Sequence, residues 1–164
     1  MAHKDSLIAE LRYESRLTRK MLERVPLEKA EWRPHEKSFT LARLATHVAE
    51  IPHWISRVIT IDDWDFAARG FSIQIAQSKD ELIDIFENKL KQAIADLETM
   101  NEGDFDKTWV VRNGEQMRRE MSKEFAIRSW GLSHFIHHRG QLSLYLRLLD
   151  VPVPGMYGPS ADEK

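Results

Sequence analysis

The feature that most constrains the fold is a helical spacing of apolar residues that returns in four long segments. In each segment, apolar side chains recur every three or four residues, the period that gathers them on one face of an α-helix. The segments span residues 4–24, 40–61, 78–101 and 122–149. Thr40 is an expected N-cap, and Ser78 with Glu81 forms an expected capping box. Pro52 lies inside the second segment and is expected to kink that helix.

The segments between the helices predict loops and one hairpin. Asn113 and Gly114 stand between two short runs of strand-forming residues, which is the signal of a two-residue type I′ turn. Residues 26–39 and 62–77 show no sustained period and are expected to be irregular, with one short turn at Leu27 to Ala30. The Pro- and Gly-rich residues 152–164 predict an extended C-terminal tail. The predicted fold class is therefore all-α: one domain over residues 1–164, a four-helix bundle with a small β-hairpin before the last helix.

The composition excludes several classes of function. With 24 basic and 26 acidic residues the formal charge is −2, so no basic field favours nucleic acid or an anionic membrane as a partner. No apolar run approaches the roughly 18 residues of a membrane span, and the charged first residues do not resemble a signal peptide. A cytoplasmic location is expected. Because the chain has no cysteine, a disulfide, a thiolate ligand and a cysteine nucleophile are all excluded.

The residues with the clearest chemistry are histidines at helical spacing. His134 and His138 are four apart in the last predicted helix, on a seam with Ile127, Gly131, Gln141, Tyr145 and Leu148, so both imidazoles are expected to point inward and to reach one ion. His47 lies on the apolar face of the second helix. Three imidazoles would leave coordination positions for water or substrate, as catalytic sites do. The alternative is that each is a buried histidine satisfied by hydrogen bonds.

Five neighbouring residues have a functional and an ordinary interpretation. Glu50 is a candidate general base, or a surface carboxylate, and Arg139 could guide an anionic substrate, or form an outward ion pair. Gln141 could fix the tautomer of an imidazole. His137 points about 100° away from the pair, which suits a supporting, packing or solvated role, and His53 is expected between helices or at the surface.

Three stretches, "LATHVAEIPHW", "HFIHHRGQL" and "VPVPGMYGPS", together resemble the DinB family, also described as DinB/YfiT-like metalloenzymes. The resemblance covers nearly the whole chain. It implies a four-helix bundle, often a homodimer, in which His47, His134 and His138 hold a divalent metal ion such as nickel, zinc, iron or manganese. It also implies a small-molecule substrate. Some relatives use a low-molecular-weight thiol such as bacillithiol or mycothiol in S-transfer or isomerisation, and others are described as hydrolases.

These observations favour a metal-dependent enzyme that activates either a thiol cosubstrate or a water molecule. The main alternative is a non-enzymatic protein that binds a metal or a small ligand in a stress response, since the sequence shows no obvious acid–base pair beside the histidines. A third alternative is a metal-free bundle that works through its surface, most simply as a homodimer.

Overall fold

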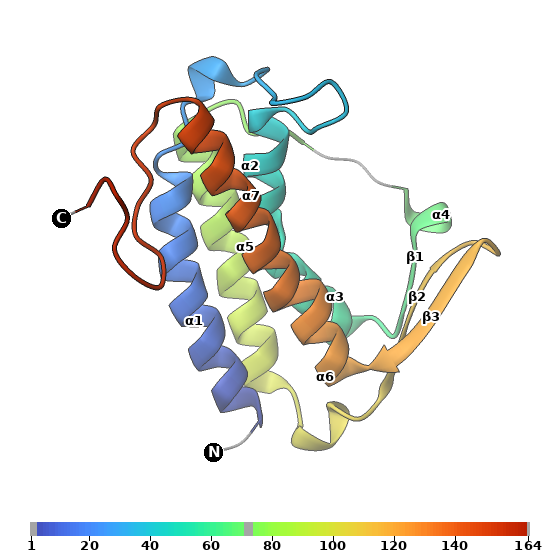
Figure 1. The fold of residues 1–164 in the computed structure, drawn as a ribbon. Coiled ribbons are helices and arrows are strands. Elements are labelled where there is room, and N and C mark those ends of the chain that lie inside the picture. The colour runs from blue at the N-terminus through green and yellow to red at the C-terminus, as the bar shows by residue number, and fades with distance from the viewer. Residues whose placement is uncertain (1–2, 71–73, 164) are drawn as a thin grey trace.

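The computed structural model describes residues 3–70 and 74–163 and is predominantly helical, with a small three-stranded sheet at one end (Figure 1). The longer helices are α1 (His3–Leu22), α2 (Leu41–Glu50), α3 (Pro52–Thr60), α5 (Lys79–Thr99) and α7 (His134–Leu148). The strands are β1 (Asp63–Asp65), β2 (Thr108–Asn113) and β3 (Met117–Ser122). The short helical pieces are η1 (Leu27–Lys29), α4 (Phe66–Arg69), η2 (Glu102–Asp104), α6 (Lys123–Ala126) and the π-helical segment η3 (Ile127–Ser133).

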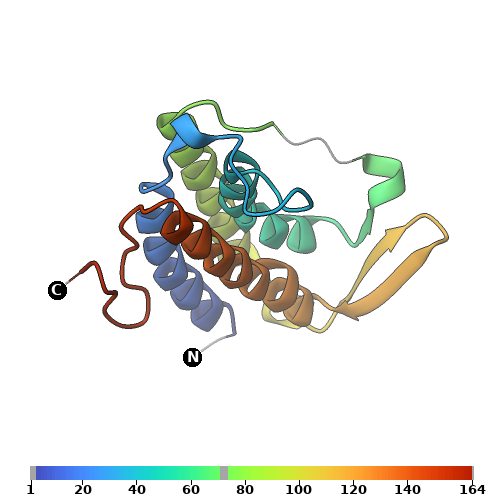
Figure 2. The ribbon, with the colours of Figure 1, turned by 45° about the horizontal axis from the view of Figure 1, so that its top comes forward.

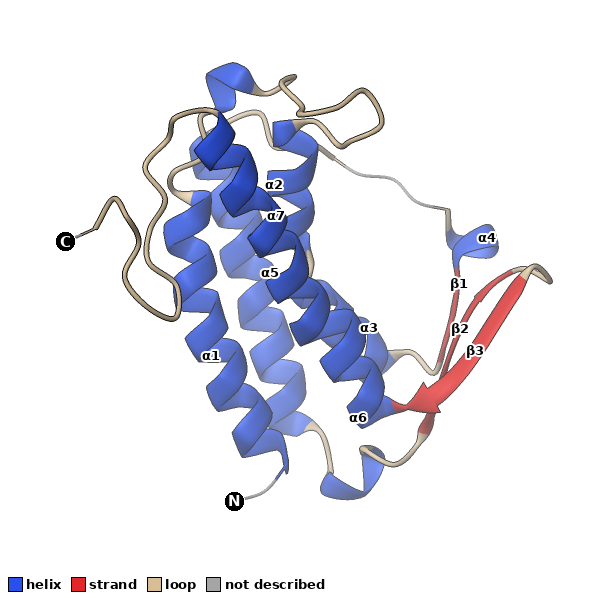
Figure 3. Cartoon of the chain, viewed as in Figure 1, coloured by secondary structure: helices blue, strands red, loops and turns tan. Residues whose placement is uncertain are grey.

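Helix α5 lies in the middle of the helical layer and contacts α1, α2 and α3, while α7 contacts α1 and α2 (Figure 3). The core lies between these helices and extends to strand β2, and its largest fully buried side chains are Trp109, Phe86, Phe105 and Phe135. Across the two described ranges, no helix combines the length and the apolar character that a membrane span requires.

The helix ends form where the sequence predicts them. The Thr40 hydroxyl accepts a hydrogen bond from the Arg43 N–H, and the Ser78 hydroxyl accepts one from the Glu81 N–H, so both side chains cap their helices. At Pro52 the second predicted helix divides into α2 and α3. Proline has no N–H to continue the hydrogen-bond ladder, and the break therefore falls where the sequence predicts a kink.

The predicted hairpin is present, but its turn and its partner strand differ from the prediction. Strands β2 and β3 pair antiparallel from Thr108↔Ser122 to Asn113↔Met117, so the loop is residues 114–116 and not a two-residue turn. Gly114 supplies the positive φ of 53° in that loop. The expectation that residues 62–77 are irregular was wrong for residues 63–69, because β1 pairs in parallel with β2 and α4 follows it. Residues 74–77 contain no helix or strand, and residues 71–73 lie outside the described residues. Figure 2 shows the sheet projecting away from the helices.

Strand β1 owes its place to long-range contacts rather than to its own pattern. Asp65 accepts hydrogen bonds from the N–H groups of Ala67 and Gly114, at 2.9 and 3.0 Å. Arg112 on β2 pairs with both Asp63, at 3.0 Å, and Asp65, at 2.8 Å. A three-residue strand with two aspartates has too little periodicity to be predicted from sequence alone.

The last predicted helix is not one regular helix, and this corrects the predicted seam. The wider turns of the π-helical segment separate α6 from α7 and change which residues face the core. In α7 the buried residues are Phe135, Arg139, Leu142, Tyr145 and Leu146. Gln141 and Leu148, predicted on the inner seam, are exposed. Within the π-helical segment, a Cβ atom on Gly131 would lie 2.6 Å from Cγ1 of Ile55, so only glycine permits this close approach to α3.

The C-terminal residues 151–163 contain no helix or strand, as predicted, and they turn back along the outside of α1 and α7 (Figure 1). Asp162 holds this segment by accepting from the N–H of Val153, at 2.9 Å, and by pairing with Arg147 on α7, at 2.5 Å. Pro154 is buried. The tail is therefore part of the packed structure.

Candidate metal centre

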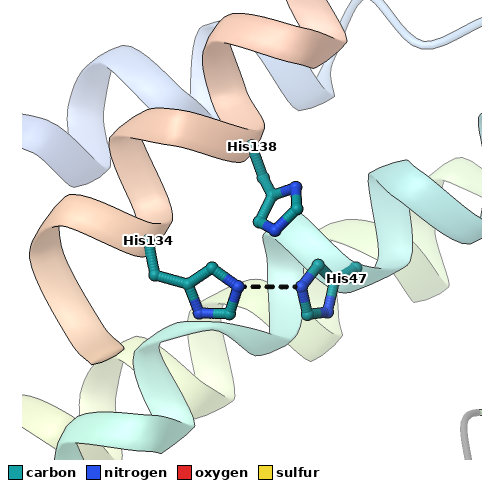
Figure 4. Close-up of side chains that lie close together, drawn as sticks. All are labelled: His47, His134 and His138. Carbon is teal, nitrogen blue, oxygen red and sulfur yellow. Dashed lines mark hydrogen bonds between the residues drawn. The ribbon is translucent and has the colours of Figure 1, made fainter. Parts of the chain in front are cut away.

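Three histidines from two helices meet at one point, as predicted (Figure 4). His47 comes from α2, His134 is the first residue of α7, and His138 lies one turn later. One ring nitrogen of each lies within 4.8 Å of the other two. The Nε2 atoms of His47 and His134 are 3.2 Å apart. Two nitrogens that each lie about 2.1 Å from one ion can be at most about 4.2 Å apart, so the 3.2 Å spacing of His47 and His134 suits a shared metal ion.

The cluster lies at the border between the core and solvent. On α2, the fully buried Leu44 and Val48 flank His47, which is itself 8% exposed. On α7 the packed face begins one residue later, at Phe135, so His134 and His138 are half-buried and lean toward α2. Histidines placed at a helix edge can bind an ion and still leave room for exchange with solvent.

Two of the three imidazoles have a partner that fixes the position of their proton. Nδ1 of His134 lies 3.2 Å from the carbonyl oxygen of Trp130, and Nδ1 of His138 lies 2.7 Å from Oε1 of Gln141. Both oxygens can only accept, so each Nδ1 carries the proton and each Nε2 keeps a lone pair. Gln141 also donates from Nε2 to His137, at 3.1 Å, which sets the orientation of its amide. The predicted tautomer-fixing role of Gln141 is supported by these contacts.

The electrostatic surroundings keep the three imidazoles neutral. Burial lowers the pKa of His47 to about 3, with further lowering from His138, His134 and Arg43. Burial lowers the pKa of His138 to about 4, against the opposing effect of the bond to Gln141, and burial also lowers the pKa of His134. Neutral imidazole is the form that binds metal, so protons compete little for these nitrogens near pH 7.

Two hollows open to solvent flank the cluster. One, of about 340 Å³, is lined by Trp130, His134 and His137 with two serines of the π-helical segment. The other, of about 430 Å³, lies between the loop before α2 and the side of α7 and is lined by residues that include Phe39, His138 and Gln141. A small molecule could therefore approach the histidines from either side.

Glu50 belongs to a stripe of residues that continues from the histidines along α2 and α3. The stripe consists of Arg43, His47, Glu50, Trp54 and Arg57, which follow one another at steps of four and three and so share one side of the two helices. Glu50 is half-buried. Its burial raises the pKa of its carboxyl, against the lowering effects of Arg43, Lys89 and Arg57. Glu50 therefore lies about one turn after His47 on the same side of α2, and no hydrogen bond joins it to a histidine in the described chain.

Arg139 lies away from the cluster, in contrast to both sequence interpretations. Its side chain is buried against α1, where it pairs with Glu14 at 2.7 Å and donates to Thr18 at 3.2 Å. It also donates to the hydroxyl of Tyr157, at 2.6 Å, in the C-terminal tail. The guanidinium thus faces neither solvent nor the histidines. Sequence reasoning missed this role because Glu14 and Tyr157 are 125 and 18 residues away along the chain.

The other histidines take positions within the predicted range. His137 is exposed and accepts the hydrogen bond of the Gln141 amide, and its ring lies edge-on to the ring of His138, with the centroids 4.8 Å apart. His53 is half-buried between helices, where burial lowers its pKa to about 4 and Lys89 and Asp96 of α5 act on it. The carbonyl of Trp130 was not predicted as part of the site, and no side-chain signal in the sequence could have indicated it.

A family model for the DinB family matches residues 1–164 of this chain. The chain belongs to the DinB family. A DinB relative at the sequence level is the uncharacterized protein YrdA of Bacillus subtilis strain 168, which is 24% identical over 159 residues, 97% of this chain and 90% of YrdA. This agrees with the resemblance carried by the histidine-containing stretches.

Two solved structures share the DinB fold. A DinB-like protein of Bacillus cereus ATCC 10987 has a TM-score of 0.71 and 20% identity, covering 93% of this chain and 97% of its own. The DinB-like protein YjoA of Bacillus subtilis has a TM-score of 0.67 and 16% identity, covering 97% and 99%. At these identities the similarity establishes the fold of the DinB protein described here, and its chemistry has to be argued from its own residues.

Proposed function

We propose that His47, His134 and His138 bind one divalent metal ion and that this DinB protein is a metal-dependent enzyme. The observation that carries the proposal is the convergence of three neutral imidazoles beside two open hollows. A site with three protein ligands leaves positions for a water molecule or a substrate, whereas structural sites close their ligand shell. The imidazole donors suit nickel, zinc, iron and manganese to different degrees and do not select one of them.

The proposed reaction is the activation of a low-molecular-weight thiol, as in an S-transferase, or of a water molecule, as in a hydrolase. When bound, the metal would supply Lewis acidity, which lowers the pKa of a coordinated thiol or water. The chain would supply the rest. Trp130 and Gln141 hold two imidazoles in the tautomer that presents Nε2. Glu50, whose pKa is raised by burial, would accept a proton from the nucleophile or return one to the leaving group.

A non-enzymatic metal- or ligand-binding protein is the second candidate. It is favoured by one observation: within the described ranges, no carboxylate or hydroxyl is hydrogen-bonded to the three histidines. The two functions predict different exchange of ligands at the metal. An enzyme requires a ligand position that substrates can occupy, so an added thiol should change the spectrum of the cobalt- or nickel-substituted protein. The spectrum of a storage site should not change.

The first test is metal content, measured by elemental analysis of protein purified without a histidine tag. Near one metal per chain is expected in the wild type, with little in His47→Ala and His138→Ala. His3→Ala is the matched control, because His3 is an exposed residue at the start of α1 whose ring packs on Phe105 and is not part of the cluster. Wild-type metal content in the His47 and His138 variants would refute the site.

The second test is a reaction screen with the metal-loaded protein. Bacillithiol, mycothiol and glutathione would be offered with electrophiles, and ester and amide panels would test hydrolysis. Turnover that disappears in His138→Ala and weakens in Glu50→Gln would support the enzyme. If protein that retains its metal turns over none of these substrates, the non-enzymatic binding function would be favoured.

Three further proposals follow from the family resemblance. We propose that the long helices act as a four-helix bundle in which α2 and α3 together form one member, that the protein is cytoplasmic, and that it forms a homodimer. Sedimentation equilibrium would test the last of these, and a monomer at micromolar concentration would exclude it.

A further inference from the structure

A cluster of aromatic side chains lies next to the histidines, where α3, the π-helical segment and the β1–α4 region meet. Trp130 is its centre. Its ring centroid lies 5.2 Å from that of Trp54, 5.9 Å from that of Trp109 and 6.2 Å from that of Phe66. Trp64 on β1 packs edge-on against Trp54, at 5.3 Å. Because the Trp130 carbonyl also holds His134, the aromatic cluster begins at the metal centre and extends away from it.

Two arginines from different elements lie on this aromatic cluster. Cζ of Arg57, on α3, is 4.6 Å from the ring centroid of Trp54 and 4.2 Å from that of Trp64. Cζ of Arg69, at the end of α4, is 5.0 Å from the Trp64 centroid. Among the described residues, no carboxylate lies within ion-pair distance of either guanidinium. Two cations therefore lie on the same Trp64 ring, and neither forms an ion pair in the described chain, although the Glu50 carboxylate acts on Arg57 from a greater distance.

Without a bound anion, the surroundings of Arg57 and Arg69 disfavour their two positive charges. Burial is the main cause that lowers the pKa of Arg57, and the nearby charge of Arg69 lowers it further, against the opposite effect of Glu50. Trp64 is 7% exposed, and its indole N–H is buried without an acceptor in the described chain. An oxyanion at this place would offset the repulsion between the cations and would accept from several donors at once.

The position of Arg57 connects it to the histidines. Arg57 closes the stripe of α2 and α3 that contains His47 and Glu50, so it lies on the same side of the helices as the metal centre. Ten residues separate it from His47, which at about 1.5 Å per residue is roughly 15 Å along the helix axis. A ligand that reaches both places is longer than a single amino acid.

We propose that Arg57 and Arg69 form an oxyanion-binding subsite, which holds the carboxylate or phosphate end of a small-molecule substrate while its reactive end lies at the three histidines. The proposal rests on the proposed function for its link to a reaction, but the subsite itself does not require the metal. The planar guanidinium fork pairs with two oxygens of one carboxylate or phosphate, and the aromatic walls strengthen the pairing by excluding water. The competing account is that the two arginines only stack on Trp64 and hold the β1–α4 region against α3.

The test uses metal-free, chelator-treated full-length protein and follows tryptophan fluorescence, since Trp54 and Trp64 line the subsite. Inorganic phosphate and succinate are titrated at constant ionic strength, with uncharged succinamide as the ligand control. The variant is Arg69→Gln, because Arg69 is exposed and its loss should leave the fold intact. Arg16→Gln is the matched control, an exposed arginine on α1 with the same change of charge.

We expect saturable binding of phosphate or succinate and no binding of succinamide. Arg69→Gln should weaken the binding of the anion roughly tenfold, the usual effect of losing a charge-assisted contact. Arg16→Gln should leave it unchanged. Arg57→Lys keeps the charge but loses the fork and should also weaken binding. The stronger of the two ligands would indicate whether the natural group is a phosphate or a carboxylate.

Equal affinity in wild type and Arg69→Gln, or no saturable binding in the wild type, would overturn the subsite and leave the stacking account. Because no metal is present, this outcome is independent of the metal-content test. Anion binding without metal binding would refute the proposed function alone, and metal binding without anion binding would refute the subsite alone.

Discussion

Replacing Arg139 by methionine should destabilise the protein without changing metal binding at the proposed three-histidine site. Arg139 is 2% exposed and Glu14 is 5% exposed, and the 2.7 Å ion pair between them is supported by hydrogen bonds to Thr18 and Tyr157. Arg139→Met keeps most of the side-chain volume but leaves the Glu14 carboxylate buried without its cation. Breaking a buried pair in this way costs about 3–5 kcal/mol of unfolding free energy.

The assay is urea denaturation followed by circular dichroism, with thermal unfolding beside it. For a chain of this size each kcal/mol lowers Tm by roughly 2–4 °C, so a fall of about 6–20 °C is expected. The double variant Arg139→Met with Glu14→Leu should recover most of the loss, since it removes both charges. Arg147→Met is the control, because its pair with Asp162 is solvent-exposed and worth about 0–1 kcal/mol.

Two results would refute this reasoning about Arg139. The first is a loss below about 1 kcal/mol, which would mean that the pair is no better than a surface pair. The second is normal stability with a lost reaction, which would return Arg139 to the substrate-guiding role suggested by its sequence position. Metal content is expected to stay at the wild-type value throughout, because the guanidinium faces α1 and not the histidines.

Three other predictions follow from the site and its supports. Gln141→Leu should weaken metal affinity by about 10- to 100-fold, because the Nδ1 proton of His138 loses its acceptor. Competition with a chromogenic chelator measures this affinity, and Gln74→Leu, at an exposed position, is the control. Equal affinities of the two variants would contradict the tautomer argument. Gly131→Ala should cost about 1–3 kcal/mol of unfolding free energy through overpacking, while Gly140→Ala, which has open space around it, should gain about 0.5–1 kcal/mol from helix propensity. The metal-free protein should lose stability as the pH falls from about 6.5 toward 4. In the unfolded chain the histidines take up protons below their ordinary pKa of about 6.5. In the folded protein the pKa values of His47 and His138 are about 3 and 4, so protons favour the unfolded state in this pH range. Urea midpoints at pH 7 and pH 5 measure this, and a His47→Leu variant with the same pH slope as wild type would disprove the assignment.

The sequence by itself determined the elements that depend on neighbours along the chain. The caps at Thr40 and Ser78, the break at Pro52 and the hairpin around Gly114 follow from backbone chemistry that acts within four residues. The spacing of His134 and His138 belongs to the same class, because residues four apart on any α-helix share a side.

Only the tertiary structure decided the features that depend on partners far along the chain. The π-helical segment sets which face of α7 is buried, and it forms where Gly131 packs on Ile55, 76 positions away in the sequence. Strand β1 exists because β2 pairs with it, and Arg139 is buried because Glu14 compensates its charge. The periodicity of a sequence depends on neighbouring residues and therefore indicates local geometry. The register and pairing of strands and the burial of charged side chains depend on which distant residues the fold brings together. For that reason the three metal-ligand candidates could be predicted from the sequence, while the groups that orient His134 and the arginines around Trp64 could be found only in the folded protein.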